Sequence, residues 1–315
     1  MTEPVFLHQI ADFSELIEKL AQVNNIRAQL VEKDYWLMHC LWALQNTELK
    51  FELKGGTSLS KGWGIINRFS EDVDIKIFPP NTMSVASGKN HVKPRHRKSR
   101  EAYFNWLLGL LNVADASSIE RDPEFDDHDL RNAGFRIGYR SLFEPLAGLK
   151  TNILLEVGFD VTTPNAPHDI SSWAYDYAIK SGVVIKDNRA LAVPCYLPEY
   201  TLVEKLAAIS KKYRQEISGR SVQNFTRHYY DVYQLLGEKR VQDFIGTQAY
   251  VKHKADRFGR ADERDLARNA AFSMPDLEIR DRFADRLGRS SGLYFRGQPS
   301  FAEIIERIQS FAGRL

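Results

Sequence analysis

The spacing of apolar residues predicts helices at both ends of the chain and strands between them. Apolar positions recur every three or four residues over 9–23 and 27–45, which is typical of two amphipathic helices. Strands are expected over 51–54, 72–78 and 151–161, with a weaker one beginning near residue 133. Residues 103–114 and most of the chain after 198 have helical spacing, and 301–311 close it as an amphipathic helix. The pattern therefore predicts an α+β fold with an all-helical C-terminal part.

Two short segments around the second strand carry the most specific local signals. The strand at 51–54 stops at the glycine pair Gly55–Gly56, and a short helix is expected next, with Thr57 or Ser58 as its N-cap. Residues 79–100 contain prolines, small residues and many cations, so a loop is expected there. The charged stretch 251–290 is expected to be helical.

Composition narrows the class of protein. The chain has 315 residues, 43% of them apolar and 27% charged, which is typical of a globular protein. No run of about 18 apolar residues and no secretory leader are present in the sequence, so no membrane span is expected and the cytoplasm is the expected location. Cys40 and Cys195 form no CxxC pair, so they indicate neither a disulfide framework nor a zinc site.

Charge is distributed unevenly along the chain. Residues 89–100 carry six cations and no acid, whereas residues 120–129 are mostly acidic. Either the two segments are solvated loops that partly neutralise each other, or the basic segment binds a polyanion such as RNA phosphate.

Asp72 and Asp74 are the best candidates for catalytic residues. Acid-x-acid pairs recur through this chain, so the spacing alone decides nothing, but these two open an apolar strand and leave it on one face. Gly55 and Gly56 precede them and permit close approach of backbone N–H groups to phosphate. Two carboxylates supply the hard oxygen ligands that Mg²⁺ prefers.

Further polar groups complete this expected phosphate site. Ser58 is placed to donate its hydroxyl to the same phosphates. Glu156 is a lone charge in the apolar run LLEVGF, and it is either a third metal ligand or base, or a residue on a wet sheet face.

The segment FELKGGTSLSKGWGIINRFSEDVDIKIF resembles the first motif of the AbiEii/AbiGii nucleotidyltransferase toxin family, which includes the MenT-type toxins. Its glycine pair is followed by Thr-x-Leu, beginning at Thr57, and then by Arg-x-Ser-x-Asp-x-Asp. The latter is matched by Arg68, Ser70, Asp72 and Asp74. EKDYWLMHCLWAL resembles the preceding helix, TLVEKLAAISKKYR the second motif with Lys205, and RHYYDVYQLL the later motif with Asp231. The resemblance covers most of the chain from about residue 30.

The resemblance implies a polymerase-β-type nucleotidyltransferase mixed sheet with a helical C-terminal lobe. Residues 1–197 would form the nucleotidyltransferase lobe with its N-terminal helices, and 198–315 the helical lobe that closes the active-site cleft. Lys205 would contact the triphosphate, Asp231 would act as a base or orient Lys205, and Arg68 would contact nucleotide or brace Asp72 or Asp74. Without the family, Lys205 would be an ordinary surface lysine and Asp231 a helix carboxylate paired with Arg227.

The same resemblance implies the function. The expected enzyme uses Mg²⁺ or Mn²⁺ to transfer a nucleotide from an NTP to an acceptor, the 3′ end of tRNA, and releases pyrophosphate. The expected partner is a cognate antitoxin, a winged-helix DNA-binding protein. Two alternatives stay open: transfer to a protein or a small molecule, and a module that binds nucleotide or RNA without catalysis.

Overall fold

The computed structural model describes residues 3–146, 149–222 and 225–315, and the chain divides into two compact units. The first comprises the chain up to Gly62 together with Phe69–Tyr196, and the second comprises Trp63–Arg68 with Leu197–Leu315. The chain thus leaves the first unit for six residues, between the glycine turn and Asp72, before it returns.

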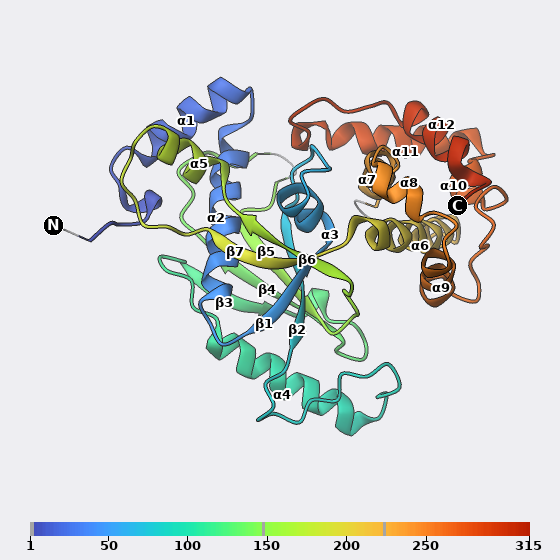
Figure 1. Ribbon diagram of the computed structural model, residues 1–315, viewed down its shortest axis with the longest axis horizontal. Helices are drawn as coiled ribbons and strands as arrows, with labels where there is room; N and C mark the ends of the chain where they lie inside the picture. The colour runs from blue at the N-terminus through green and yellow to red at the C-terminus, as the bar shows by residue number, and fades with distance from the viewer. Residues whose placement is uncertain (1–2, 147–148, 223–224) are drawn as a thin grey trace. The chain divides into compact units, whose positions relative to one another are not determined.

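The first unit is built on one mixed seven-stranded sheet in the order β3-β4-β5-β2-β1-β7-β6 (Figure 1). The strands are β1 Lys50–Lys54, β2 Asp72–Phe78, β3 Ser118–Asp122, β4 Asn132–Gly138, β5 Asn152–Gly158, β6 Asn165–Ile170 and β7 Ala190–Tyr196. β2 lies centrally, antiparallel to β1 and parallel to β5, and β1 is parallel to β7. The expected strands at 51–54, 72–78, 133 onward and 151–161 are confirmed, as is the mixed sheet.

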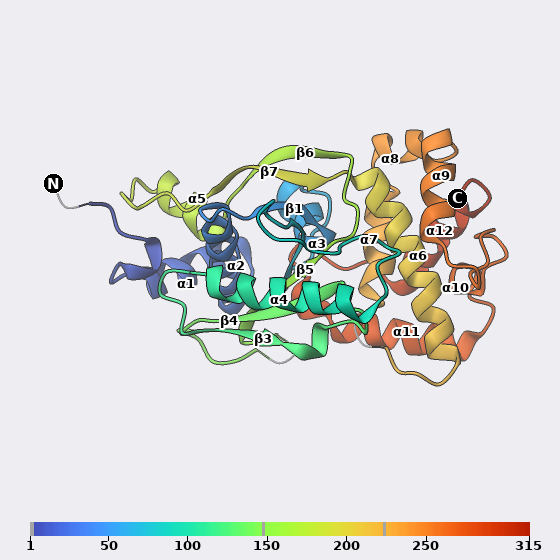
Figure 2. The ribbon, with the colours of Figure 1, turned by 90° about the horizontal axis from the view of Figure 1, so that it is seen from below.

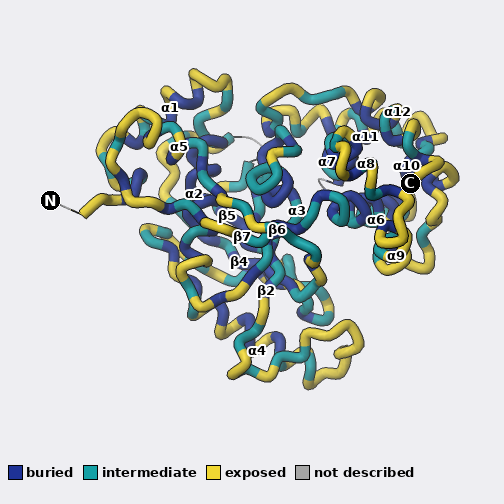
Figure 3. The backbone as a smooth tube through the Cα atoms, in the orientation of Figure 1, coloured by how far each residue is buried: buried dark blue, intermediate teal, exposed yellow. Residues whose placement is uncertain are grey.

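Helices surround this sheet. They are α1 Phe13–Asn24, α2 Ala28–Gln45, α3 Gly55–Thr57, α4 Pro94–Leu110 and α5 Trp173–Lys180, with short helical turns at Leu7–Gln9, Ser58–Gly62 and Pro123–Phe125. α2 packs against β2, β5 and β7 and is buried at every residue from Leu30 to Leu41, so it appears as a largely dark segment in Figure 3. α4 packs beside β3, well separated from α1 and α5 (Figures 1 and 2).

The second unit is helical, as expected from the spacing after residue 198. Its helices are α6 Pro198–Ile217, α7 Arg227–Leu235, α8 Lys239–Phe244, α9 Gln248–Arg257, α10 Ala270–Ser273, α11 Leu277–Arg289 and α12 Phe301–Ala312, with a 3-10 turn at Ser291–Leu293. α6 packs against α7, α8, α9 and α10. Edge-to-face contacts among Phe225, Tyr229, Phe283 and Phe301 fill the core where α7, α11 and α12 meet.

Two expectations about elements were wrong, and four elements were not expected. The loop expected over 79–100 ends at Lys93, because α4 begins at Pro94, and proline is favoured in the first turn of a helix. The stretch 251–290 is broken between α9 and α11, where residues 258–269 form no helix. β3, β6, β7 and α5 were not expected; β3 and β6 are edge strands, and β6 carries Pro167, so neither shows the alternation of a half-buried strand.

Candidate active site

The first two carboxylates of the site stand on the central strand β2. Asp72 begins the strand and Asp74 follows two residues later, so both side chains leave the same face. The intervening and following residues Val73, Ile75 and Ile77 are buried on the opposite face. The apolar face therefore holds β2 in the core while the polar face presents the two acids.

Glu156 lies beside Asp74 on the neighbouring strand. Parallel pairing of β2 with β5 places Glu156 directly across from Asp74, and Lys54 of β1 faces Asp74 from the other side. Adjacent strands are about 4.8 Å apart, so the three residues form one rung of the sheet. The sheet register thus brings Asp72, Asp74 and Glu156 together, although Glu156 is far from the pair in sequence.

The three carboxylates interact electrostatically. Burial, followed by the charges of Asp74 and Asp72, raises the pKa of Glu156 to about 8. The pKa of Asp72 is also raised, chiefly by burial; the Lys150 ammonium opposes this shift and the Asp74 charge adds to it. Like charges held this close in a partly buried place favour either a bound proton or a bound cation.

Gly55 makes room for the Asp74 carboxylate. Its φ is +69°, a conformation that glycine adopts without strain. A Cβ added there would lie 2.1 Å from Oδ2 of Asp74, inside any permitted contact. Both the backbone conformation and the neighbouring carboxylate therefore require glycine at this turn between β1 and α3.

The capping prediction for the following helix was wrong. α3 begins at Gly55 and its N-cap is Lys54, which makes no side-chain capping bond. Thr57 instead donates its hydroxyl to the Asp72 carbonyl at 2.5 Å, which ties the turn to the start of β2. The Ser58 side chain is completely buried and lies against the Cys195 thiol, so it presents no hydroxyl to solvent. Gly56 is buried, and Ser70 is half-buried just before β2.

Lys150 is a member of the site that sequence reasoning missed. Its Nζ lies 3.4 Å from Oδ1 of Asp72, and its backbone N–H donates to Glu71. The buried Lys33 of α2 holds the Lys150 carbonyl with a 2.7 Å hydrogen bond. Asp34, which follows Lys33 in α2, accepts a hydrogen bond from the backbone N–H of Trp173 and forms an ion pair with Lys61 at 2.5 Å. Buried charges of α2 thus hold the segments around β2 in place.

The donor set fits a divalent cation such as Mg²⁺ or Mn²⁺. Carboxylate oxygens are the ligands that hard cations prefer, and the sheet register places Glu156 beside Asp74, with Asp72 on the same face of β2. Within the described ranges, no three His, Cys, Asp or Glu side chains are already gathered as a metal-binding group. Lys150 supplies the positive charge nearest to Asp72.

A second charged group lies within the helical unit. Asp231 of α7 is fully buried, and Arg68 holds both of its oxygens, with Nε to Oδ1 at 2.7 Å and Nη2 to Oδ2 at 2.8 Å. Lys205 of α6 binds Oδ2 at 2.9 Å. Burial alone would raise the pKa of Asp231, but Arg68 and Lys205 hold it well below the ordinary value. Arg68 was expected to contact nucleotide or to brace Asp72 or Asp74, and in the structure its guanidinium binds Asp231.

His228 extends this group beyond Lys205. Its Nδ1 lies 3.3 Å from Nζ of Lys205, and its Nε2 lies 2.9 Å from Nζ of Lys212. Burial and then the two ammonium groups lower the pKa of His228 well below its ordinary value, so the ring is neutral near pH 7. Lys205 is therefore held between a carboxylate and a neutral imidazole, which fixes its direction.

Comparison with solved structures gives matches among nucleotidyltransferases. MenT4, a nucleotidyltransferase toxin of Mycobacterium tuberculosis, is 14% identical with a TM-score of 0.47, covering 94% of each chain. An antigenic nucleotidyltransferase-like protein of Paracoccidioides brasiliensis is 13% identical with a TM-score of 0.39, covering 71% of this chain and 87% of its own. Terminal uridylyl transferase 4 of Trypanosoma brucei, with bound UPU, is 13% identical with a TM-score of 0.28, covering 72% of this chain and 58% of its own. Comparison with curated proteins gives no match.

The family comparison covers most of the chain. The model of the nucleotidyl transferase AbiEii toxin of type IV toxin–antitoxin systems matches residues 36–307. This range contains the glycine turn, the three carboxylates, and the Arg68–Asp231–Lys205 group. It implies an NTP substrate and an antitoxin partner. No helix among the described residues has the length and apolarity needed to span a membrane. The chain belongs to the AbiEii family of nucleotidyltransferase toxins.

Proposed function

We propose that this protein uses Mg²⁺ or Mn²⁺ to transfer a nucleotidyl group from an NTP to the 3′ end of tRNA, with release of pyrophosphate. The observation that carries the proposal is the rung formed by Asp74 and Glu156, with Asp72 two residues away and Gly55 against the Asp74 carboxylate. Asp72 and Asp74 would hold the metal, and Glu156 would lie beside it. When bound, the metal neutralises triphosphate charge and polarises the α-phosphate.

Glu156 is the proposed base. The acceptor hydroxyl oxygen bonds to the α-phosphorus, the bond from that phosphorus to the bridging oxygen of the β-phosphate breaks, and pyrophosphate leaves. The hydroxyl proton passes to the Glu156 carboxylate, which shares a rung with Asp74 and so lies beside the metal ligands. Asp231 is unsuited, because Arg68 and Lys205 hold its oxygens and keep its pKa low.

The Lys205 ammonium is proposed to bind the leaving phosphates. Asp231 and His228 orient it, and neutral His228 leaves its positive charge intact. The proposal requires Lys205 and the carboxylates to act on one NTP.

The glycine turn is proposed to approach the triphosphate through backbone N–H groups of Gly55 and Gly56. Thr57 holds that turn to β2, and Ser70 stands at the entrance to the strand. Because the Ser58 hydroxyl is buried, it has no place in this phosphate-binding set. The proposed antitoxin partner is a winged-helix DNA-binding protein, and the proposed location is the cytoplasm.

One labelling experiment tests the reaction and its acceptor. Purified protein is incubated with Mg²⁺, each α-³²P-labelled NTP, and either deproteinised bacterial tRNA, total protein or small-molecule extract. We expect label on tRNA 3′ ends with stoichiometric pyrophosphate, and loss of both in Asp74→Ala. Label only on protein or small molecules would move the acceptor to those classes. Tight NTP or RNA binding without pyrophosphate would indicate a non-catalytic module, and full activity of Asp74→Ala would refute the metal site.

A further inference from the structure

A cluster of exposed cations lies outside the site described above. It consists of Lys89 in the loop before α4 and of Lys93, Arg95, Arg97 and Lys98 at the start of α4; we call these five residues the basic platform. All five are exposed, and much of the loop before α4 is exposed in Figure 3. The helical part, from Lys93 to Lys98, is about 7 Å long, and Lys93 and Arg97, four residues apart, share one face of the helix that the other charges do not, so the charges are spread around its first turns.

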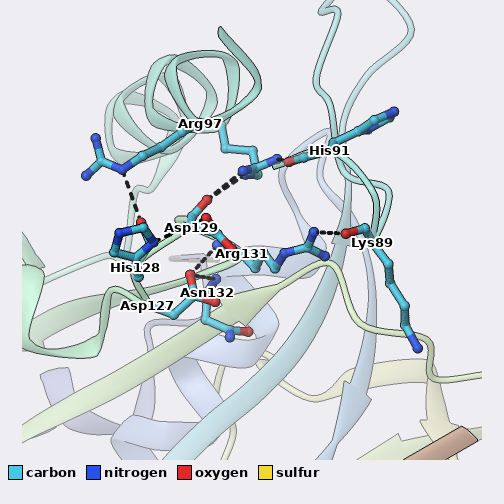
Figure 4. Close-up of polar contacts among 9 residues, drawn as sticks. Lys89, His91, Arg97, Asp127, His128, Asp129, Arg131 and Asn132 are labelled. Carbon is cyan, nitrogen blue, oxygen red and sulfur yellow. Dashed lines mark hydrogen bonds and ion pairs between the residues drawn. The ribbon is translucent and has the colours of Figure 1, made fainter. Parts of the chain in front are cut away.

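The backbone beneath the basic platform is firmly held. Arg100 is fully buried, and its guanidinium donates to the carbonyl of Asp129 and to the loop before α4. Arg131 donates to the same loop (Figure 4). The loop carbonyls that accept these bonds are Ala86, Gly88, Lys89 and His91. Arg100 and Arg131 therefore fix the loop, whereas the five platform side chains are exposed.

Two acids of the segment 120–129 pair with arginines outside the basic platform. Asp126 pairs with Arg121 at 2.7 Å, and Asp122 pairs with Arg136 at 2.5 Å. Asp127 accepts the backbone N–H of Arg131. Among the residues with described positions, no ion pair joins the platform to a carboxylate. Glu101 is the one acid on the first two turns of α4. The sequence left two interpretations: that the acidic and basic segments partly neutralise each other, or that the basic segment binds a polyanion. The structure favours the second, because the basic platform is exposed and makes no described ion pair with a carboxylate.

The contacts of individual platform residues agree with this. Arg97 donates through Nε to the His128 carbonyl at 3.3 Å, and its terminal nitrogens point away from the cluster, as does the Lys89 ammonium (Figure 4). The pKa of His96, within the platform, is lowered by partial loss of solvation and then by nearby positive charges including Arg95 and Lys93. The local potential is therefore positive.

The sheet register places the basic platform outside the metal site. Gly134 pairs with Glu156, and Arg131, which holds the platform loop, precedes Gly134 by three residues. β4 begins at Asn132, about 7 Å along the strand from Gly134, and Arg131 lies just before it. The loop that Arg131 holds is therefore on the same unit as the carboxylates but outside their rung, where it can meet the backbone of a polymer whose end occupies the site.

We propose that the basic platform binds the phosphate backbone of the acceptor RNA and so delivers its 3′ end to the carboxylates. This inference rests on the proposed transfer to tRNA. Its physical basis is counterion release: each phosphate neutralised by a lysine or arginine adds about 0.7–0.9 to the dependence of log affinity on log salt.

The test uses two triple variants of the full chain. The platform variant carries Lys89→Ala, Lys93→Ala and Lys98→Ala, which remove three platform charges. The Lys93 side chain makes no capping hydrogen bond to α4, so its substitution removes no cap. The matched control carries Lys19→Ala, Lys50→Ala and Lys180→Ala, which remove three exposed lysines elsewhere in the first unit. Binding of deproteinised tRNA is measured without NTP over a salt series, and KM for tRNA and kcat are measured with NTP.

We expect the platform variant to bind tRNA at least tenfold more weakly near 0.1 M salt, with a salt slope lower by about 2, and a raised KM with kcat at saturating tRNA unchanged. The control should match wild type. Equal losses in both triples, or wild-type KM and slope in the platform variant while tRNA is still labelled, would overturn the platform and leave the reaction standing. Platform-dependent binding of duplex DNA with no effect on tRNA would also overturn it. Absence of any tRNA labelling by wild type would remove the proposed function together with the inference.

Discussion

Replacing Gly55 by alanine separates backbone strain from damage to the carboxylate site. At φ +69° an alanine costs about 1–2 kcal/mol of folding stability. Its Cβ would lie 2.1 Å from Oδ2 of Asp74, whereas ordinary contact begins at 3.4 Å, so the carboxylate must move by the difference, about 1.3 Å. Cγ of Asp74, at 2.9 Å, must move with Oδ2, and Cβ, at 3.1 Å, must give by a few tenths of an ångström, so the collision adds to the stability loss. A displacement of about 1 Å in a reacting group lowers rates by about 100-fold.

Gly64 supplies the matched control. Its φ is +65°, and a Cβ added there meets no atom within 4 Å, so Gly64→Ala has the strain without the collision. Thermal unfolding and the initial rate of nucleotide transfer are measured for both variants. We expect a loss of stability in both variants, larger in Gly55→Ala, but about a 100-fold lower rate only in Gly55→Ala. A Gly55→Ala protein with wild-type transfer, or a Gly64→Ala protein equally impaired, would refute the assigned contact.

Three further predictions follow from the charged groups. Burial and like charges raise the pKa of Glu156 to about 8, above its value in the unfolded chain, so without metal its contribution to stability declines as pH rises from about 4.5 to 8. Glu156→Gln should lessen this decline in melting curves recorded in EDTA. An unchanged pH dependence of the melting temperature would contradict the assigned pKa. Lys205→Met should lower kcat/KM for the NTP by about 10- to 100-fold, because it removes a charged hydrogen bond of about 1.5–3 kcal/mol. Lys211→Met, on the exposed side of the same helix, should leave this kcat/KM at the wild-type value. Arg68→Leu leaves the Asp231 carboxylate buried with Lys205 as its remaining described ion-pair partner, so denaturant unfolding should show a loss of about 3–5 kcal/mol; a loss under 1 kcal/mol would contradict the buried pairing.

Local pattern was sufficient to predict the strand that carries Asp72 and Asp74. The alternation in DVDIKIF matches β2 from Asp72 to Phe78, because one face of that strand is buried and the other is polar. Glu156 stood out as a single charge in an apolar run, and the parallel pairing with Asp74 explains its place. Local signals were also misread: Pro94 opens α4, and Gly55 rather than Thr57 begins α3.

Contacts between distant segments could not be predicted in this way. Arg68 and Asp231 are 163 residues apart, and neither residue's surroundings in the sequence indicate the other. Lys150 precedes a strand like many lysines, and its role follows only from the register that places β5 beside β2. Charge composition likewise left the acidic segment 120–129 free to neutralise the basic one. In the structure two of its six acids, Asp122 and Asp126, pair with Arg136 and Arg121, and none of the described acids pairs with the basic platform.

The most direct test of the carboxylate site is a titration with Mn²⁺ at pH 8, followed by electron paramagnetic resonance in the presence of a non-hydrolysable NTP analogue. We predict saturable Mn²⁺ binding in the wild type and its loss in Asp74→Asn, with Asp169→Asn, an acid elsewhere on the first unit, unchanged. Wild-type Mn²⁺ affinity in a folded Asp74→Asn protein would contradict the account.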